Sequence, residues 1–335
     1  MLSDATLDRI LGRLPAVRVG VLGDLFLDRY LDIDAGLTEP SLETGLDAYQ
    51  VVRVRSYPGA AGTVINNLAA LGVGGIVPIA IVGDDGEGHE LRQALRSMPA
   101  VDQTHIISWP GRRTPTYTKP MLQHPGDPAR ELNRLDIKNR NLTPPGAEDA
   151  IIEALDALWP EVDAWIVLDQ VSEENCGVIT DRVRNRVSEL GATDPGKFVL
   201  ADSRERIERF RHVCIKPNER EGRDVFALQQ RCGRAVFWTR GEHGIWLFPP
   251  DESHPIQVPG FPVHGPIDPV GAGDSVSAGI ASAVAAGASL EHAAAFGNLV
   301  ASITIQQIGT TGTAGPEQVR DRWREVRDLP PPPHV

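Results

Sequence analysis

One stretch of the chain combines a carboxylate with a run of very small residues. Residues 268–279 read Asp-Pro-Val-Gly-Ala-Gly-Asp-Ser-Val-Ser-Ala-Gly, so Gly271, Ala272 and Gly273 stand where a loop enters a helix. Small side chains let the free amides at a helix N-terminus approach an anion, and the helix dipole favours negative charge there. We expect Asp274 to stay ionised and to accept a hydroxyl proton while these amides hold a phosphoryl group. The alternative is an ordinary turn into a helix with Asp274 as a cap.

Further carboxylates follow apolar runs that are typical of buried strands. Asp24 and Asp28 come directly after the run 17–22, and Asp169 and Asp202 end two later runs. Ligands of open α/β sheets bind beyond the carboxyl ends of the strands, so we expect these carboxylates at the ligand edge. Asp24 and Asp28 can hydrogen-bond sugar hydroxyls; alternatively they belong to a solvated turn.

A polar pair with the spacing of one helical turn follows at Asn218 and Glu221. An amide and a carboxylate so placed can hold the water shell of Mg²⁺, an ion that keeps several of its waters. The alternative is the start of a capped helix.

The order of the predicted elements indicates how these residues are positioned. From residue 147 onward, helical patterns over 148–158 and 173–190 alternate with strand patterns over 164–169 and 197–202. This alternation predicts βαβ units and a mostly parallel central sheet flanked by helices, the α/β class.

Three segments before residue 147 have a different, more polar pattern. Residues 49–57 alternate polar and apolar side chains, and 104–109 and 114–121 are similarly extended. Exposed or half-covered strands have this pattern. We therefore expect a small second sheet that projects from the main domain.

Composition excludes several other classes of protein. The 335 residues carry a formal charge of −12 with a pI near 5.2, which opposes binding to nucleic acid. Cys176, Cys214 and Cys232 are odd in number and lack C-x-x-C spacing, so we expect neither a disulfide framework nor a zinc site. Without a basic leader or a long apolar run, the sequence predicts a cytoplasmic protein with no membrane partner.

Several motifs together resemble the ribokinase-like (PfkB) family of carbohydrate kinases, in family order across residues 17–313. Besides 268–279, residues 58–67 resemble the family's Gly-Gly-x-x-x-Asn signature, and Thr239, Gly241 and Gly244 match its Thr-x-Gly-x-x-Gly turn. The run 23–30 and the turn 309–313 resemble the branch of heptose-7-phosphate kinases, the kinase half of enzymes that also synthesise ADP-heptose.

This resemblance implies an ATP-dependent kinase that uses Mg²⁺ and acts on a hydroxyl of a sugar or sugar phosphate. It implies that the phosphates of ATP lie over 271–273, that Asp274 is the catalytic base, and that Asn218 and Glu221 hold the metal through water. The nucleotide-binding residues that it implies are Thr239, Gly241, Gly244 and Asn298, the last beside adenine.

The resemblance also implies an acceptor site under a β-sheet lid and a homodimer through that lid. The acceptor site comprises Asp28, Gly59, Ala60, Thr63, Lys119 and Asp169, with Lys119 matching the heptose kinase pattern for a phosphate on the substrate.

Three positions depart from the family pattern. Ala60 replaces the second glycine of the signature, Thr63 replaces an asparagine that contacts the sugar, and Pro269 replaces the usual threonine. Some members also bind a monovalent cation beside this loop. Because proline has no backbone N–H, the use of that cation by this chain stays an open question.

These expectations define one kinase domain over residues 1–328, with lid strands within about 26–58 and 102–137, and a disordered proline-rich tail over 329–335. Two alternatives remain, a kinase of a nucleoside or other non-sugar alcohol, and a nucleotide- or sugar-binding protein without turnover. Asp274 argues against the second, since loss of the base is the usual mark of an inactive kinase.

Overall fold

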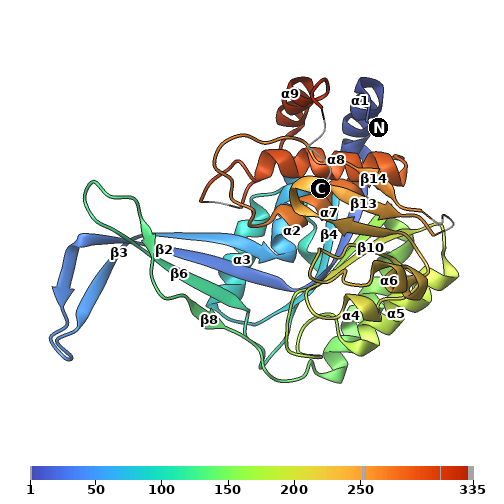
Figure 1. Cartoon of the computed structure of the whole chain (residues 1–335). Coiled ribbons are helices and arrows are strands. Elements are labelled where there is room, and N and C mark those ends of the chain that lie inside the picture. Colours follow the sequence, from blue (N-terminus) through green and yellow to red (C-terminus); the bar gives the residue numbers. More distant parts are fainter. Residues whose placement is uncertain (1, 251, 253, 310, 331–335) are drawn as a thin grey trace.

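The computed structural model describes residues 2–250, 252, 254–309 and 311–330, and its largest element is a central sheet (Figure 1). Apolar runs that include β-branched residues form its middle strands, which are buried on both faces. Neighbouring strands are parallel from β12 to β5, and the edge formed by β12, β13 and β14 is antiparallel. The strand order in this sheet is β14 (Ile256–Val258), β13 (Ile245–Phe248), β12 (Val236–Thr239), β11 (Cys214–Ile215), β10 (Phe198–Ser203), β9 (Ala164–Asp169), β1 (Arg18–Gly23), β4 (Gly75–Val82) and β5 (Ile106–Ser108).

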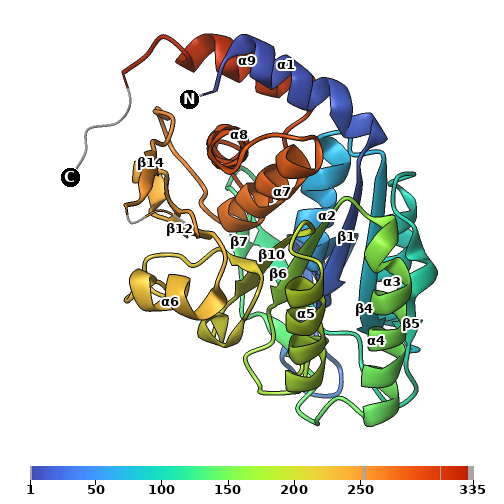
Figure 2. The same cartoon turned by 90° about the vertical axis from the view of Figure 1, so that its right-hand side faces the viewer.

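Helices cover both faces of this sheet (Figure 2). The helices that bury side chains in one of its two hydrophobic clusters are α1 (Asp4–Arg13), α2 (Ala61–Ala70), α3 (Gly86–Arg96), α7 (Ala272–Ala285), α8 (Leu290–Thr304) and α9 (Pro316–Val326). The helices that contribute to the other cluster are α4 (Pro145–Leu158), α5 (Asp181–Thr193) and α6 (Val225–Cys232).

Specific contacts hold two pairs of helices together, α7 with α8 and α1 with α9. A Cβ on Gly279 of α7 would lie 2.8 Å from the Cα of Gly297 in α8, so glycine at this position lets the two helices pack closely. The terminal helices α1 and α9 are held together because the Trp323 Nε1–H donates to Asp4 and Arg327 forms an ion pair with the same carboxylate.

A second, smaller sheet projects from the body of the molecule as a lid (Figure 1). Only Asp24 separates β1 from the first lid strand, and the second lid strand runs directly into α2. The lid strands are β2 (Leu25–Pro40), β3 (Asp47–Ala60), β6 (Thr116–Gln123), β7 (Arg130–Glu131) and β8 (Leu135–Ile137). Alternation gives the lid two faces: on one, Arg29 of β2 bonds to Glu90 of α3, while Asp28 and Lys119 are directed to the other.

The predicted α/β architecture, with a mostly parallel sheet, flanking helices and a lid, is confirmed. The prediction for one lid segment was wrong: residues 104–109 contribute β5 to the edge of the main sheet, where it pairs with β4. The predicted helix over 173–190 begins only at Asp181, because Thr180 caps it and residues 173–178 form a loop beyond β9. The predicted tail lies outside the described residues from 331 onward.

Among the described helices, we find none with the length and apolar character needed to cross a membrane.

Candidate active site

The loop at 268–274 enters α7 with an unusual backbone conformation. Gly271 has φ of 80°, and a Cβ added there would lie 2.7 Å from Thr311 Cγ2, so the position requires glycine. The Ala272 N–H donates to the Pro269 carbonyl oxygen. Within the described residues no backbone acceptor is present for the N–H groups of Gly271, Gly273 and Asp274. These three amides are therefore the ones available to an anion.

A buried ion pair lies beside this loop, and the sequence reasoning missed it. The Lys216 ammonium is 2.8 Å from the Asp202 carboxylate, and only 3% of Lys216 is exposed. Asp202 lies on β10 and Lys216 follows the adjacent β11. A Cβ on Gly273 would lie 3.5 Å from Lys216 Nζ, which places the ammonium next to the anion-binding amides.

The charges around Asp274 change its protonation. Burial, and then the negative charge of Asp202, raise the pKa of the Asp274 carboxyl to about 7, while Lys216 and Arg204 act in the opposite direction. Our expectation that the helix N-terminus keeps Asp274 ionised was therefore wrong at this point, because loss of solvent and a neighbouring carboxylate outweigh the helix dipole. A carboxylate that titrates near neutral pH is suited to act as a general base.

Asn218 and Glu221 form a closed hydrogen-bonded turn. Both the backbone N–H and the side-chain Nδ2 of Asn218 donate to the Glu221 carboxylate, at 2.9 and 2.8 Å. Burial raises the pKa of Glu221, the Asn218 N–H opposes this shift, and the charge of Asp202 adds to it. The pair therefore lies within electrostatic reach of the Asp202 and Lys216 pair, with both side chains bonded to each other.

The lid residues that are expected to contact the phosphoryl-acceptor substrate lie together. Lys119 Nζ is 3.5 Å from Asp28 Oδ1 and 3.1 Å from the Tyr30 hydroxyl oxygen. A Cβ on Gly59 would lie 2.5 Å from Asp28 Oδ2, so the glycine leaves room for this carboxylate. Burial opposes protonation of Lys119, but Asp28 and Tyr30 outweigh it and raise the pKa of the ammonium.

The two replaced signature positions connect the lid to the α7 loop. Ala60 joins β3 to α2 with φ of 53° and ψ of −116°, a conformation that glycine adopts readily and alanine does not. Thr63 is buried in the first turn of α2, and its Cγ2 lies 3.5 Å from where a Cβ on Gly271 would be. The α2 and α7 N-termini therefore meet at this point.

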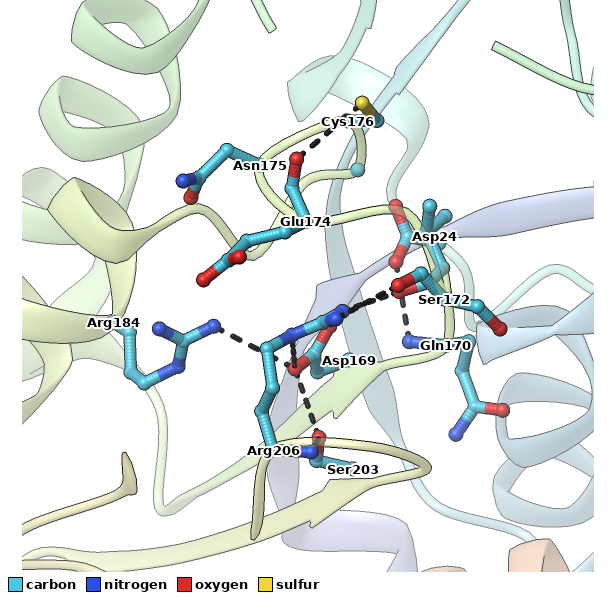
Figure 3. Close-up of polar contacts among 12 residues, drawn as sticks. Asp24, Asp169, Gln170, Ser172, Glu174, Asn175, Cys176, Arg184, Ser203 and Arg206 are labelled. Atoms are coloured by element: carbon cyan, nitrogen blue, oxygen red, sulfur yellow. Dashed lines mark hydrogen bonds and ion pairs between the residues drawn. The ribbon is translucent and has the colours of Figure 1, made fainter. Parts of the chain in front are cut away.

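Asp169 is surrounded by basic side chains of the protein itself (Figure 3). Arg206 donates to both carboxylate oxygens, Ser203 donates at 2.8 Å, and Arg184 lies 3.6 Å away. Asp169 is only 2% exposed and its oxygens accept bonds from these protein groups, so its carboxylate faces the protein rather than a substrate. It anchors the loop after β9, since Arg206 also bonds to the Val171 and Ser172 carbonyl groups.

Asp24 links the end of β1 to the same loop. Its carboxylate accepts an N–H bond from Gln170 at 3.3 Å (Figure 3). It also accepts a shorter N–H bond from Val178, at 2.7 Å. Burial raises the pKa of Asp24 to about 6, although the Val178 bond opposes the shift. Asp24 therefore positions the 170–178 loop beside the base of the lid.

The expected nucleotide-binding turn joins β12 to β13. Gly241 and Gly244 have φ of 54° and 81°, and a Cβ on Gly244 would lie 2.4 Å from the Gly260 nitrogen. Thr239 bonds through its backbone N–H to the Pro217 carbonyl oxygen. Asn298 donates from Nδ2 to the carbonyl oxygens of residues 258 and 259, so its amide nitrogen holds this chain segment in place.

Residues 198–316 match the pfkB family carbohydrate kinase, a segment that begins at β10 and includes the whole α7 loop. This segment of the chain is therefore similar to the pfkB-family carbohydrate kinases.

Curated relatives are similar over a longer stretch of the chain. The bifunctional protein HldE of Caulobacter sp. (strain K31) is 30% identical over 93% of this chain and 65% of that protein. The bifunctional protein HldE of Pseudomonas syringae pv. syringae (strain B728a) is 27% identical with the same coverage. The chain thus spans about 65% of the length of these relatives.

Solved ribokinase structures have the same fold as this chain. An Arabidopsis thaliana ribokinase complexed with ribose and ATP aligns with a TM-score of 0.63 at 17% identity, over 91% of this chain and 98% of that one. An E. coli putative ribokinase II in complex with ATP and Mg²⁺ aligns with a TM-score of 0.61 at 17% identity, over 92% and 99%. At these identities the likeness establishes a ribokinase-like fold.

Within this candidate site, residues that are contiguous in the sequence were predictable, and pairs that depend on the packing of distant strands were not. Gly271 to Asp274 are contiguous, whereas the pair of Lys216 and Asp202 depends on the pairing of β10 with β11. The buried lysine before Pro217 and Asn218 was the available signal, because a lysine in an apolar run needs a partner.

Proposed function

We propose that the protein transfers the γ-phosphoryl group of ATP to a hydroxyl of a sugar or sugar phosphate. One observation carries the proposal: a carboxylate with a pKa of about 7, Asp274, lies at the N-terminus of α7 beside free amides and a buried lysine. The base and the anion site lie in one turn of backbone, as in-line phosphoryl transfer requires.

In the proposed reaction the acceptor oxygen attacks the γ-phosphorus and the bond to the bridging oxygen of ADP breaks. Asp274 takes the proton of the acceptor hydroxyl. The Gly271, Gly273 and Asp274 amides and the Lys216 ammonium stabilise the charge on the transferred group.

The nucleotide would extend from this loop towards Thr239, Gly241, Gly244 and the segment held by Asn298. The residues fit magnesium held through water: Asn218 orients the Glu221 carboxylate near Asp202, and each carboxylate oxygen accepts one bond from Asn218 and keeps a lone pair for a water of the ion. When bound, Mg²⁺ neutralises phosphate charge that this acidic protein would otherwise repel.

The acceptor would lie between the lid and the strand ends, in contact with Asp28, Gly59, Ala60 and Thr63. A heptose 7-phosphate is the acceptor that the resemblance of the first and last motifs favours. We further propose that residues 1–328 act as one kinase domain, that the protein is a cytoplasmic homodimer joined through the lid, and that neither nucleic acid nor membrane is a partner.

The test measures ADP release from purified protein with ATP, Mg²⁺ and a panel of sugars, sugar phosphates and nucleosides. Asp274→Asn should reduce kcat about 10²- to 10⁴-fold on the best acceptor with KM little changed, because the amide keeps the shape but accepts no proton.

The matched control is Asp268→Asn at the other end of the loop, where the carboxylate accepts the Val270 N–H and pins the backbone. This variant should retain far more of kcat than Asp274→Asn. Near-normal turnover by Asp274→Asn would show that the base lies elsewhere, and turnover of nucleosides alone would favour the non-sugar alternative.

A further inference from the structure

The turn expected to bind the nucleotide lies directly beside the turn expected to hold the metal. We call residues 239–244 the nucleotide turn and residues 218–222 the metal turn. Thr239 donates to the Pro217 carbonyl oxygen from its backbone N–H at 2.9 Å and from its hydroxyl at 3.3 Å. Thr239 also forms a parallel β-bridge with Asn218. The backbone therefore joins the two turns where each of them begins.

A pair of indole rings packs against both turns. Trp238 on β12 is the cross-strand partner of Trp246 on β13, and the rings meet edge to face with their centroids 5.8 Å apart. The nucleotide turn connects these two strands. A Cβ on Gly222 would lie 2.6 Å from Trp238 Nε1, so this indole lies against the last residue of the metal turn. The indole pair is thus a surface that the two turns share.

Arg240 crosses this shared surface. Its backbone N–H donates to the Gly244 carbonyl oxygen at 2.8 Å, which closes the nucleotide turn. Its guanidinium carbon lies 4.8 Å from the centroid of the Trp238 ring and 5.1 Å from that of Trp246. Its Nε donates to the Glu219 carboxylate in the metal turn at 3.3 Å. A single side chain of the nucleotide turn therefore contacts both the indole pair and the metal turn.

The contact between Arg240 and Glu219 stabilises the fold only weakly. The Glu219 side chain is 59% exposed, and an ion pair with so exposed a partner contributes little to stability. The contact is important for geometry, because a bound Mg²⁺ bridges phosphate oxygens and phosphoryl transfer depends on positioning. The residues that hold the ion must therefore keep a fixed separation from the residues that hold the nucleotide.

We propose that Arg240 is a positioning residue that fixes the nucleotide turn relative to the metal turn, so that Mg²⁺ and the nucleotide increase each other's affinity. The inference rests on the proposed function, in which these turns bind the nucleotide and the ion. Because such a coupling is reciprocal, it can be measured from the affinity for the nucleotide alone. The arginine should affect the gain in affinity on adding Mg²⁺ rather than the metal-free affinity.

A direct contact with the nucleotide phosphates is the competing role for this arginine. The guanidinium is already stacked on the indole pair and bonded to Glu219, so it is directed towards the protein. A direct contact would strengthen nucleotide binding with and without Mg²⁺, whereas a positioning residue strengthens it only where the ion is present. The two roles can therefore be separated by experiment.

The test is calorimetric titration of ADP into the protein without acceptor, once in a chelator and once with saturating Mg²⁺. Arg240→Met keeps an unbranched side chain over the indole pair and removes the guanidinium. The ratio of the metal-free Kd to the Kd with Mg²⁺ should fall about 2- to 10-fold, the size expected for loss of one hydrogen bond. The metal-free Kd should change by less than about twofold, because no nucleotide contact is lost. Formation of MgADP in solution is common to all variants and cancels in the comparison.

Two further substitutions test the pairing with Glu219. Glu219→Gln should lower the ratio by a similar factor, and adding it to Arg240→Met should lower the ratio no further, because both changes remove the same interaction. Arg240→Lys should restore part of the ratio relative to Arg240→Met, since lysine keeps the charge but lacks the planar donors. Additive effects of Glu219→Gln and Arg240→Met would contradict the pairing.

The matched control is Arg220→Gln, which removes an exposed arginine from the metal turn at the position after Glu219. Its ratio should equal that of the wild type. An unchanged ratio in Arg240→Met would overturn the inference. An equal loss of affinity with and without Mg²⁺ would also overturn it, in favour of a direct contact with the nucleotide.

The same binding data separate this inference from the kinase proposal. A ratio that falls in Arg240→Met, together with no ADP release by the wild type with any acceptor, would support the coupling and contradict the kinase proposal. Normal turnover by the wild type, together with an unchanged ratio in Arg240→Met, would support the kinase proposal and overturn the coupling.

Discussion

Asp274 lies between a carboxylate that raises its pKa and two basic groups that lower it, so its environment sets the pH range of the proposed reaction. The carboxyl has a pKa of about 7 and must be ionised to accept a proton. We expect kcat/KM to rise with pH through an apparent pKa near 7 and to level off above it. Initial rates measured from pH 5.5 to 9 at subsaturating acceptor test this expectation.

Asp202→Asn is the informative variant in the same assay. It removes the negative charge that raises the pKa of Asp274, and it leaves the Lys216 ammonium unpaired, which also favours the ionised form. The apparent pKa should therefore shift downward. A profile that stays at the wild-type position would mean that another group controls the rise.

The same carboxylate should reduce the stability of the protein at neutral pH. Because the folded pKa of about 7 exceeds the unfolded value of 3.8, the contribution of Asp274 to stability is complete below about pH 4 and is lost as pH rises to about 7. Asp274→Asn does not titrate, so its gain in the free energy of unfolding over wild type should be larger at pH 8 than at pH 5, by more than about 1 kcal/mol.

Denaturant titrations of both proteins at the two pH values measure this difference. Asp268→Asn, which removes a half-buried carboxylate from the same loop, serves as the control for the general effect of this substitution on stability. A constant difference between Asp274→Asn and wild type would contradict the assigned environment.

At the scale of elements, the junction between β3 and α2 carries backbone strain. Ala60 has φ of 53° and ψ of −116°, a region that costs residues with a Cβ about 1–3 kcal/mol. We expect Ala60→Gly to raise the free energy of unfolding by about 1 kcal/mol, measured by urea denaturation. Ala61→Gly is the matched control at the next position, inside α2, and should lower it by about 0.5–1 kcal/mol. If both glycines destabilise, Ala60 is not strained.

Elements with strong local patterns were predictable, and those that depend on distant partners were not. The predicted strand at 164–169 coincides with β9, and 197–202 lies within one residue of β10, because continuous apolar runs of this length form buried strands. Residues 104–109 carry only three strand residues, too few to reveal that they pair with β4 rather than with the lid. The cavity of about 230 Å³ between the base of the lid and the strand ends could not be predicted from the sequence either, since its wall combines lid residues with loops after β1, β9 and β10.

At the scale of the molecule, the lid exposes an unusual number of apolar side chains beyond the body. The exposed residues on its long strands include Leu37, Tyr49, Val51, Val52 and Val54. Exposed apolar surface on a projecting sheet is typical of an interface, so this surface supports the proposed homodimer.

We expect the double variant Val52→Asp and Val54→Asp to shift the protein from dimer to monomer in sedimentation velocity experiments, because four charged carboxylates would be buried in a twofold interface. Leu142→Asp, an equally exposed apolar residue outside the lid, should leave the dimer unchanged. A wild-type protein that sediments as a monomer at all concentrations would contradict the dimer.

The contact between α1 and α9 has a consequence for how the chain can be connected. Asp4 bonds to both Trp323 and Arg327, so the two terminal helices are neighbours in space. A short linker from α9 to α1 would close the polypeptide into a ring, and the ring can be reopened in the exposed turn at 41–46, at the tip of the lid. In such a circular permutant β3 would become the first strand and β2 the last, with the candidate active site formed by the same neighbours in a new order.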